Sequence, residues 1–470
     1  MERRDFFRNS SLATAGFALS PLLLAADDGS SLVERELKDE AKNIIFLVSD
    51  GMSSGTLNMA DLFSQRTYGK HSTWIENYKN GRFRRSMMDT ASASSIVTDS
   101  AAGGSAWGGG KRVPNGSLNV GANGEEYTPI LQKFKNQGKK VGCVTTVPIT
   151  HATPASFCVN NKSRRHQDEI AVDYKTLKFD VMMGGGHEHF DASLREDGRD
   201  LYADFTAEGF DVVQNKQDIP PLLDSEKPLL GVFQKSALPY TLDQMGNGKL
   251  IEKIPSLPEM LAVAIDKMKD HKEGFVLQVE GGKVDWAAHS NDSPGLIYDQ
   301  IAFDQAVKRA LDFAIKDKNT LVIVTTDHGN GNPGLFYGTD ADKNFDRFRT
   351  MKQSNKWVMD GLTKSMNKST LKERIETAQG YVVSDEDAQR ILQFIENMSE
   401  EEMENDYKKP FELYAQIQKK HTNVGWGGMK HSADFVELAA FGPGSELLPP
   451  FVKNTFLHNM MLKSCGKAVK

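Results

Sequence analysis

The chain has 470 residues, of which 39% are hydrophobic and 26% charged, and its formal net charge is −6 at pH 7. This composition is ordinary for a globular protein with an extensive core, and the length corresponds to about three domains of average size. A nucleic-acid partner is not expected, because contacts to phosphate backbones require a basic surface.

Residues 1–26 have the form of an export signal. They begin with a basic segment that contains the paired Arg3 and Arg4, continue with an apolar stretch and end in small residues. The apolar stretch is short for a bilayer span and contains Pro21, so we expect no membrane span. The paired arginines resemble a twin-arginine signal, which implies export to the periplasm or the medium in a folded state.

Three cysteines, Cys143, Cys158 and Cys465, cannot all pair within one chain. An exported location would permit a disulfide, but nothing in the sequence requires one. The redox state of these cysteines therefore stays open at this stage.

Four short apolar runs end in turn-forming residues and suit strands that are covered on both faces. They lie at 43–52, 139–154, 274–282 and 322–331. Helical patterns lie between them, such as the capping-box spacing of Ser256 and Glu259 and the apolar face from Phe303 to Ala314. Strands that alternate with helices predict an α/β fold with a large, mostly parallel central sheet flanked by helices.

The segment at about 341–424 differs from the rest of the chain. It is polar, rich in Lys and Glu and helical in pattern, with a second capping signal from Ser384 to Asp387. We interpret it as an inserted helical region within a single unit that spans 27–470. Its charge runs are typical of a solvated helix face.

Acidic and imidazole side chains follow several of the predicted strands. Asp50 follows the first apolar run, Glu280 ends the third, and Asp327 and His328 end the fourth. In open α/β sheets, ligands bind outside the carboxyl ends of the strands. Three separate strands therefore deliver these side chains to one edge, although Asp327 and His328 alone would fit an ordinary turn.

Three further residues fit the same edge. Asp285 and His289 have i, i+4 spacing, which puts both on one face of a helical turn at a distance suited to one ion. His431 lies in a glycine-rich loop that leads into the last apolar strand. Taken alone, the pair would be an exposed helix pair and His431 an ordinary loop histidine.

Ser100 is the candidate nucleophile. Asp99 precedes it and small residues that suit a helix follow it. At a helix N-terminus its hydroxyl would face the positive end of the helix dipole, where a phosphate can also bind. The alternative is that Asp99 or Ser100 only caps the helix.

Converging carboxylates repel one another and are costly to desolvate unless cations compensate them. The four carboxylates at this edge are Asp50, Glu280, Asp285 and Asp327. With three histidines beside them, zinc fits the mixed donor set, while an all-oxygen subset fits magnesium.

These residues resemble the alkaline phosphatase family, in chain order over most of the sequence after residue 26. The matching motifs are SDGM at 49–52, TDSAA at 98–102, HATP at 151–154, SRR with Arg164, EGGKVDWAAH at 280–289, TTDH at 325–328 and the loop histidine 431. The resemblance implies an exported phosphatase that hydrolyses phosphate monoesters through a phosphoserine, with two Zn²⁺ and one Mg²⁺, and that is often a homodimer.

Carried over position by position, the resemblance implies that Ser100 is phosphorylated, that Arg164 clamps two phosphate oxygens and that Asp99 orients Arg164. Arg165 is the alternative for the clamp, but its spacing from HATP is less suitable. The implied metal ligands are Asp285, His289 and His431 for the first zinc, Asp50, Asp327 and His328 for the second, and Asp50, Thr153 and Glu280 for magnesium.

Two residues depart from the pattern of some members. His151 stands where an acid precedes the ATP stretch, and Trp286 follows Asp285 in place of a lysine or histidine. Both lie where substrate and third metal would meet, so weak Mg²⁺ binding or tolerance of Co²⁺ is expected there. His187 and His189 are interpreted as part of a structural loop.

Three other functions are compatible with parts of the sequence. A phosphodiesterase or sulfatase of the same superfamily is the nearest alternative, although no sulfatase modification motif is found. A cofactor-independent phosphoglycerate mutase also fits TDHGN, but an export signal does not suit a glycolytic enzyme. A metal-storage protein would not need both a nucleophile and a phosphate clamp.

Overall fold

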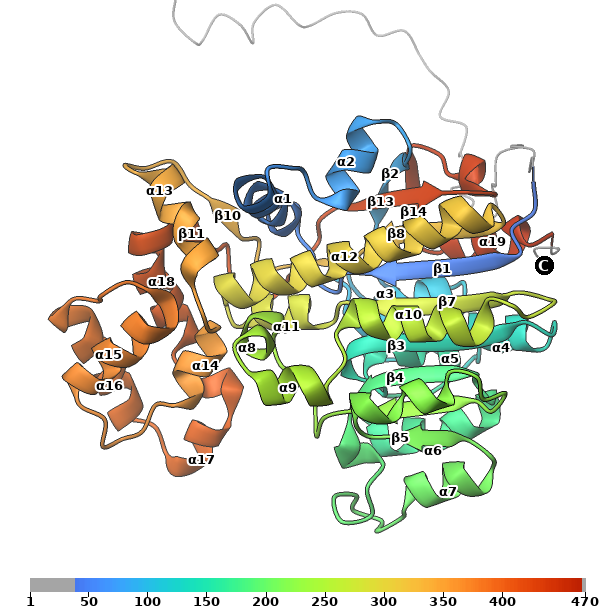
Figure 1. Cartoon of the computed structure of the whole chain (residues 1–470), viewed down its shortest axis with the longest axis horizontal. Helices are drawn as coiled ribbons and strands as arrows, with labels where there is room; N and C mark the ends of the chain where they lie inside the picture. The colour runs from blue at the N-terminus through green and yellow to red at the C-terminus, as the bar shows by residue number, and fades with distance from the viewer. Residues whose placement is uncertain (1–38, 467–470) are drawn as a thin grey trace, which may run out of the picture.

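The structure is a computed structural model that describes residues 39–466 (Figure 1). The predicted export signal at 1–26 lies outside the described residues. Within 39–466, none of the helices has the length and apolar character that a membrane crossing requires.

A sheet of ten strands runs through the molecule in the order β14-β2-β13-β8-β1-β7-β3-β4-β6-β5. The strands are β1 (Asn43–Val48), β2 (Arg84–Asp89), β3 (Lys140–Pro148), β4 (Val181–Gly185), β5 (Asp211–Val213), β6 (Leu229–Val232), β7 (Phe275–Glu280), β8 (Thr320–Thr325), β13 (Val436–Phe441) and β14 (Phe451–Lys453). Strand β13 is antiparallel to both of its neighbours, and the other pairings in this sheet are parallel. The predicted fold class is confirmed.

Helices cover both faces of the sheet (Figure 1). One face carries α1 (Ser54–Tyr68), α2 (Thr73–Lys79), α8 (Thr241–Met245), α9 (Gly248–Lys253), α10 (Leu257–Met268), α11 (Lys283–His289) and α12 (Ser293–Asp317). The other carries α3 (Ser100–Gly108), α4 (Ile130–Lys135), α5 (Ala152–Cys158), α6 (Gln167–Leu177), α7 (Leu201–Ala207) and α19 (Phe456–Ser464). Alternate residues of β1 enter the two hydrophobic cores, Ile45 one and Phe46 the other, because successive strand side chains point to opposite faces.

The polar segment after β8 contains a group of helices at the end of the molecule toward which the β1 arrow points (Figure 1). They are α13 (Ala341–Phe345), α14 (Asn355–Asp360), α15 (Lys368–Gln379), α16 (Asp385–Glu396), α17 (Glu400–Glu404) and α18 (Phe411–Thr422). Two short strands, β10 (Gly334–Leu335) and β11 (Val424–Gly425), pair antiparallel on either side of this group in the chain. The Ser384 hydroxyl caps α16 by accepting a hydrogen bond from the Asp387 amide.

The strand register sets the edge at which the predicted site residues meet. Val48, the last residue of β1, pairs with Glu280 of β7 on one side and with Thr325 of β8 on the other. The carboxyl ends of three central strands are therefore level with one another.

Candidate active site

Asp50, Glu280 and Asp327 meet at this level edge, and all three are fully buried. The carboxylate atoms Oδ1 of Asp50, Oε1 of Glu280 and Oδ2 of Asp327 have no hydrogen-bond partner among the described residues. Burial, and then the charges of Asp327 and Asp285, raise the pKa of Asp50 well above its ordinary value. Burial also raises the pKa of Glu280 to about 7. This edge is an unfavourable place for carboxylates unless a cation lies among them.

After the end of β8, the chain pairs with a later segment and so brings His431 to the same edge of the sheet. β8 ends at Thr325, and β9 (Gly329–Asn330) pairs antiparallel with β12 (His431–Ser432), with His431 opposite Asn330. The ring of His431 stacks on that of His328 with centroids 3.6 Å apart. Gly331 then turns the chain with a φ of +64°, where a side chain would collide with Trp426. Gly329, which lies in β9, has no positive φ.

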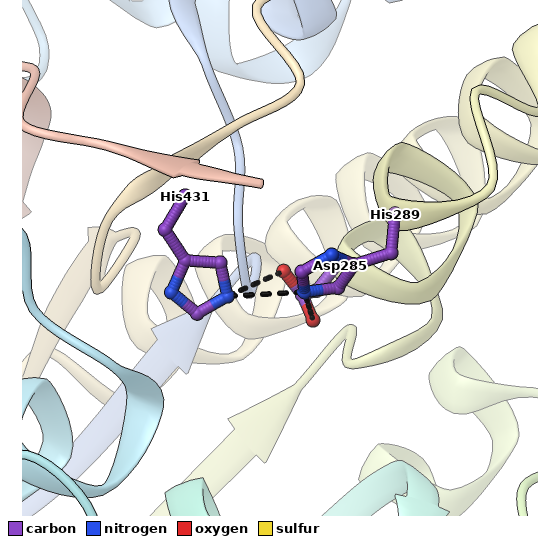
Figure 2. A group of neighbouring side chains, drawn as sticks. All are labelled: Asp285, His289 and His431. Carbon is purple, nitrogen blue, oxygen red and sulfur yellow. Dashed lines mark hydrogen bonds and ion pairs between the residues drawn. The ribbon is translucent and has the colours of Figure 1, made fainter. Parts of the chain in front are cut away.

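Asp285, His289 and His431 form a group whose ligand atoms face one another (Figure 2). The two Nε2 atoms of His289 and His431 are 3.1 Å apart, and Oδ2 of Asp285 is 3.4 Å from Nε2 of His289. Each histidine has its Nδ1 within hydrogen-bond distance of a carbonyl oxygen, at Met429 or Thr98. A carbonyl only accepts, so each Nδ1 carries the proton and each Nε2 presents a lone pair. Two lone pairs and a carboxylate that converge in this way fit a divalent cation.

Two further groups of potential metal ligands lie beside the first. One combines Asp50, Asp285 and His328, and the other combines Asp50, His151 and Glu280. Asp327 belongs to the same cluster, because its Oδ2 lies 3.2 Å from Nε2 of His328. The structure therefore brings together all of the predicted metal-binding acids and histidines.

Ser100 is the first residue of α3, and its side chain is buried against this cluster. Its hydroxyl oxygen lies 3.2 Å from Nε2 of His328. Asp99 is the N-cap, and its carboxylate accepts a hydrogen bond from the Ala102 amide. Helix α3 packs so closely on α5 that a side chain at Gly104 would collide with Ser156. At the start of α3, Asp99 therefore caps the helix while Ser100 faces the cluster of potential metal ligands.

Arg164 lines a cavity of about 850 Å³ together with Asp285, His289 and His431, which are potential metal ligands. Its Nη1 donates to Asp99 Oδ2 at 3.1 Å, and its Nη2 donates to His151 Nε2 at 2.9 Å. Burial works against the charge of Asp99, but the guanidinium lowers the pKa of this carboxyl below its ordinary value. Arg165 also lines the cavity, yet the polar contacts to Asp99 and His151 belong to Arg164.

His151 lies between this arginine and Glu280. Its Nδ1 is buried without a hydrogen-bond partner among the described residues and is 3.9 Å from Glu280 Oε1. Burial, and then the charge of Arg164, lower the pKa of His151 to about 3. The ring of Trp286 meets that of His151 edge-on, with centroids 6.3 Å apart. The two departures noted in the sequence are therefore neighbours in space.

Thr153 belongs to the same corner of the cluster, where its hydroxyl donates to Asp50 Oδ2 at 3.3 Å. Two residues that the sequence motifs do not indicate hold the acids in place. The Thr145 hydroxyl donates a short hydrogen bond to Glu280, and Asn330 Nδ2 donates to Asp285 Oδ1 at 2.7 Å. Thr145 stands inside an apolar strand run, where its sequence context gives no functional signal, whereas Asn330 adjoins the DHG motif.

His187 and His189 lie apart from this cluster. They form the short 3₁₀ segment η1 (His187–His189), in which His187 bonds to the Tyr202 hydroxyl and His189 to Asp168. These contacts agree with a structural loop.

The fold and the site together define an α/β enzyme in which a serine adjoins several potential metal ligands. A family model for alkaline phosphatase matches residues 41–466. Alkaline phosphatase 4 of Bacillus subtilis is 31% identical, with 96% of this chain and 94% of the relative covered, and alkaline phosphatase 3 of the same organism is 32% identical, with 92% and 91% covered. The crystal structure of Thermus thermophilus alkaline phosphatase superposes with a TM-score of 0.85 at 30% identity and covers 93% of each chain. The chain belongs to the alkaline phosphatase family, whose members are metal-dependent phosphatases.

Proposed function

We propose that this enzyme hydrolyses phosphate monoesters to inorganic phosphate and an alcohol, and that Ser100 is the residue that becomes phosphorylated. The observation that carries this proposal is the 3.2 Å approach of the Ser100 hydroxyl to His328 Nε2, inside the cluster of potential metal ligands. Phosphoryl transfer depends on positioning and charge stabilisation, which a buried serine beside bound cations and an arginine would provide.

We assign two Zn²⁺ and one Mg²⁺ to this cluster. Asp285, His289 and His431 would hold the first zinc, Asp50, Asp327 and His328 the second, and Asp50, Thr153 and Glu280 the magnesium. When bound, such cations neutralise the buried carboxylates, stabilise the attacking and leaving oxygens and lower the pKa of the hydroxyls and waters that they bind.

Arg164 orients the phosphate group in this proposal. A planar guanidinium can bond two phosphate oxygens at once, which an ammonium cannot. Its Nη1 and Nη2 already bond Asp99 and His151, so these two residues fix the direction from which it approaches. The depressed pKa of Asp99 keeps this carboxylate ionised beside the guanidinium over a wide pH range.

The same cavity, which Ser100 also lines, would receive the leaving alcohol. Trp286 of α11 and Phe411 of α18 line it together with Lys356 of α14. Two of these residues belong to the helical region after β10. We therefore assign this region, at about 341–424, a role in substrate access within a single catalytic unit at 27–470.

The test of the proposed function is turnover of p-nitrophenyl phosphate at alkaline pH, with and without a chelator, beside the variant Ser100→Ala. We expect the chelator to abolish turnover and zinc to restore it. We expect Ser100→Ala to lose roughly a thousandfold or more in kcat with an unchanged metal content. An unchanged rate in this variant would contradict the nucleophile assignment, and faster turnover of a diester or a sulfate ester would favour the alternative hydrolases.

The third metal site is proposed to bind Mg²⁺ weakly and to accept Co²⁺. An imidazole at 151 offers nitrogen where a carboxylate would suit a hydrated magnesium ion. Metal analysis after dialysis should find less than one Mg²⁺ per chain in the wild type and more in His151→Asp. Full Mg²⁺ retention by the wild type would show that this expectation is wrong.

Two further proposals concern the whole protein. We propose that residues 1–26 direct export through a twin-arginine route, and that the enzyme forms a homodimer like many members of its family. Cell fractionation of the wild type beside an Arg3→Lys/Arg4→Lys variant tests the first proposal, and sedimentation of the purified holoenzyme tests the second. A cytosolic wild type or a monomeric holoenzyme would contradict them.

A further inference from the structure

Two thiols lie in contact in the core beneath the active site. Sγ of Cys143, in the middle of β3, is 3.7 Å from Sγ of Cys158, the last residue of α5. Both side chains are buried in the same hydrophobic core, between the sheet and the helices that cover this face. The third cysteine, Cys465, directly follows α19 near the end of the described chain.

We propose that Cys143 and Cys158 form an intrachain disulfide when the enzyme meets an oxidising environment. A disulfide has an S–S length of about 2.05 Å, so the two sulfur atoms must approach by about 1.7 Å from their present separation. A movement of this size is within the range of small side-chain rotations and a slight shift of the end of α5. The inference goes beyond the proposed function, because neither thiol is assigned to a metal or to the substrate.

The bond would close a loop that carries part of the proposed active site. The two cysteines are 15 positions apart. The residues between them include His151, which bonds Arg164, and Thr153, which bonds Asp50. A covalent link from β3 to the end of α5 therefore encloses the turn on which the third metal site depends, and it restricts local opening of that turn.

An oxidant would reach the pair of thiols at Cys158. This residue lines a cavity of about 520 Å³, together with Asn160, Gln132 and Asp173. Cys143 has no exposed surface, and burial raises the pKa of its thiol well above the ordinary value. Cys158 is thus the sulfur that a small reagent meets first, and Cys143 reacts second.

The chemistry is a thiol–disulfide exchange with a small disulfide as the oxidant. The Cys158 thiolate attacks the reagent, so a mixed disulfide forms and one reagent thiol leaves. The Cys143 thiolate then attacks Sγ of Cys158, and the second reagent thiol leaves. Two protons and two electrons are lost by the protein, and the reagent disulfide is reduced to two thiols.

The experiment uses the folded holoenzyme, purified with all cysteines reduced and then incubated with bis(2-hydroxyethyl) disulfide at pH 8. After acid quenching, unfolding and alkylation, we expect one alkylated cysteine in place of the three cysteines of the sequence. Peptide mapping should identify the Cys143–Cys158 cross-link. The oxidised holoenzyme should unfold at a temperature higher by about 2–5 °C, and a reductant should reverse this shift.

Three variants make the result specific. Cys465→Ser should still form the cross-link, whereas Cys143→Ala and Cys158→Ala should not. The wild-type comparison before and after oxidation needs no variant, so the test stands even if a core substitution prevents folding. Three alkylated cysteines after prolonged incubation, a cross-link to Cys465, or a mixed disulfide that persists at Cys158 would each overturn the proposal. All readouts are masses and melting temperatures, so failure of the proposed phosphatase function would leave them unaffected.

Discussion

Two buried polar clusters in this protein differ in how their atoms are satisfied. The first, called here the acidic edge, consists of Asp50, Glu280, Asp285 and Asp327 at the carboxyl ends of the central strands. The second, called here the amide–tyrosine network, lies in the helical region and consists of Asn355, Gln379, Tyr381, Tyr414 and Gln418. Both are withdrawn from water, but only the acidic edge contains like charges in contact.

The amide–tyrosine network satisfies its own hydrogen-bonding groups. Gln379 Oε1 accepts from the hydroxyls of Tyr381 and Tyr414 and from Gln418 Nε2, at 2.6, 2.9 and 2.8 Å. Gln379 Nε2 in turn donates to Asn355 Oδ1 at 2.7 Å. A neutral network with its donors and acceptors paired stabilises and rigidifies the core around it.

The acidic edge does not satisfy its own hydrogen-bonding atoms. Three of its carboxylates each have a buried oxygen atom without a hydrogen-bond partner among the described residues. Burial and the charges of neighbouring carboxylates raise the pKa of Asp50 well above its ordinary value, and burial raises the pKa of Glu280 to about 7. Burial of polar groups alone therefore does not indicate function. Buried charges that the protein leaves uncompensated indicate a ligand of opposite charge.

The substitution Asp50→Asn tests whether the acidic edge depends on a bound cation. This substitution removes a charge that is shared by two of the ligand groups, so we expect a loss of roughly 10²–10³-fold in kcat/KM for p-nitrophenyl phosphate. The metal-free protein should not lose stability, and its melting temperature should rise by roughly 1–3 °C because repulsion is relieved. Calorimetry in excess chelator, with metal analysis of the untreated variant, measures both effects. A lower melting temperature of the metal-free variant would mean that the acidic edge is stabilising by itself.

Much of the acidic edge could be predicted because it follows from strand ends. Apolar runs that stop at Asp50, Glu280 and Asp327 place these acids at one edge as soon as the strands are parallel and adjacent. The i, i+4 spacing of Asp285 and His289 likewise needs only a helical turn. These are local patterns combined with one general rule about sheets.

Other contacts depend on long-range geometry that no local pattern contains. His431 reaches the cluster because β12 pairs with β9, two strands of two residues each that are about a hundred positions apart in the chain. The bond between Arg164 and His151 depends on a turn after α5, and the amide–tyrosine network joins α14, α15 and α18. The amides of this network belong to a segment whose polar composition predicts a solvated surface. Their burial could therefore not be predicted from the sequence.

The substitution Gln379→Leu tests how much the amide–tyrosine network contributes to stability. It leaves the hydroxyls of Tyr381 and Tyr414 and the amides of Asn355 and Gln418 with fewer partners, so we expect the free energy of unfolding to fall by about 1–3 kcal/mol. The value of kcat/KM for p-nitrophenyl phosphate should stay within about twofold, because Gln379 does not line the catalytic cavity. Urea unfolding beside Gln393→Leu, which alters an exposed glutamine of the same region, provides the matched control. Equal stability of the two variants would show that the network contributes no more than a surface residue.

Asp292 is a buried carboxylate that connects the two regions. Its oxygens accept hydrogen bonds from the amides of Gly295 at the start of α12 and of Lys356 in α14, each at 2.9 Å. Burial nevertheless raises its pKa from 3.8 to about 6. Between these two values the folded protein keeps a proton that the unfolded chain has released, so this group lowers the free energy of unfolding as the pH rises from about 4 to about 6.

Asp292→Asn removes this titration and keeps the size of the side chain. The stability of the wild type relative to the variant should therefore decrease by roughly 1–3 kcal/mol between pH 4 and pH 7. Urea unfolding of both proteins in excess chelator at several pH values in this range measures the difference. Parallel pH profiles would mean that the two backbone hydrogen bonds compensate the burial of Asp292 completely. In that case this carboxylate would resemble the amide–tyrosine network, in which hydrogen bonds suffice, more than the acidic edge, which needs a cation.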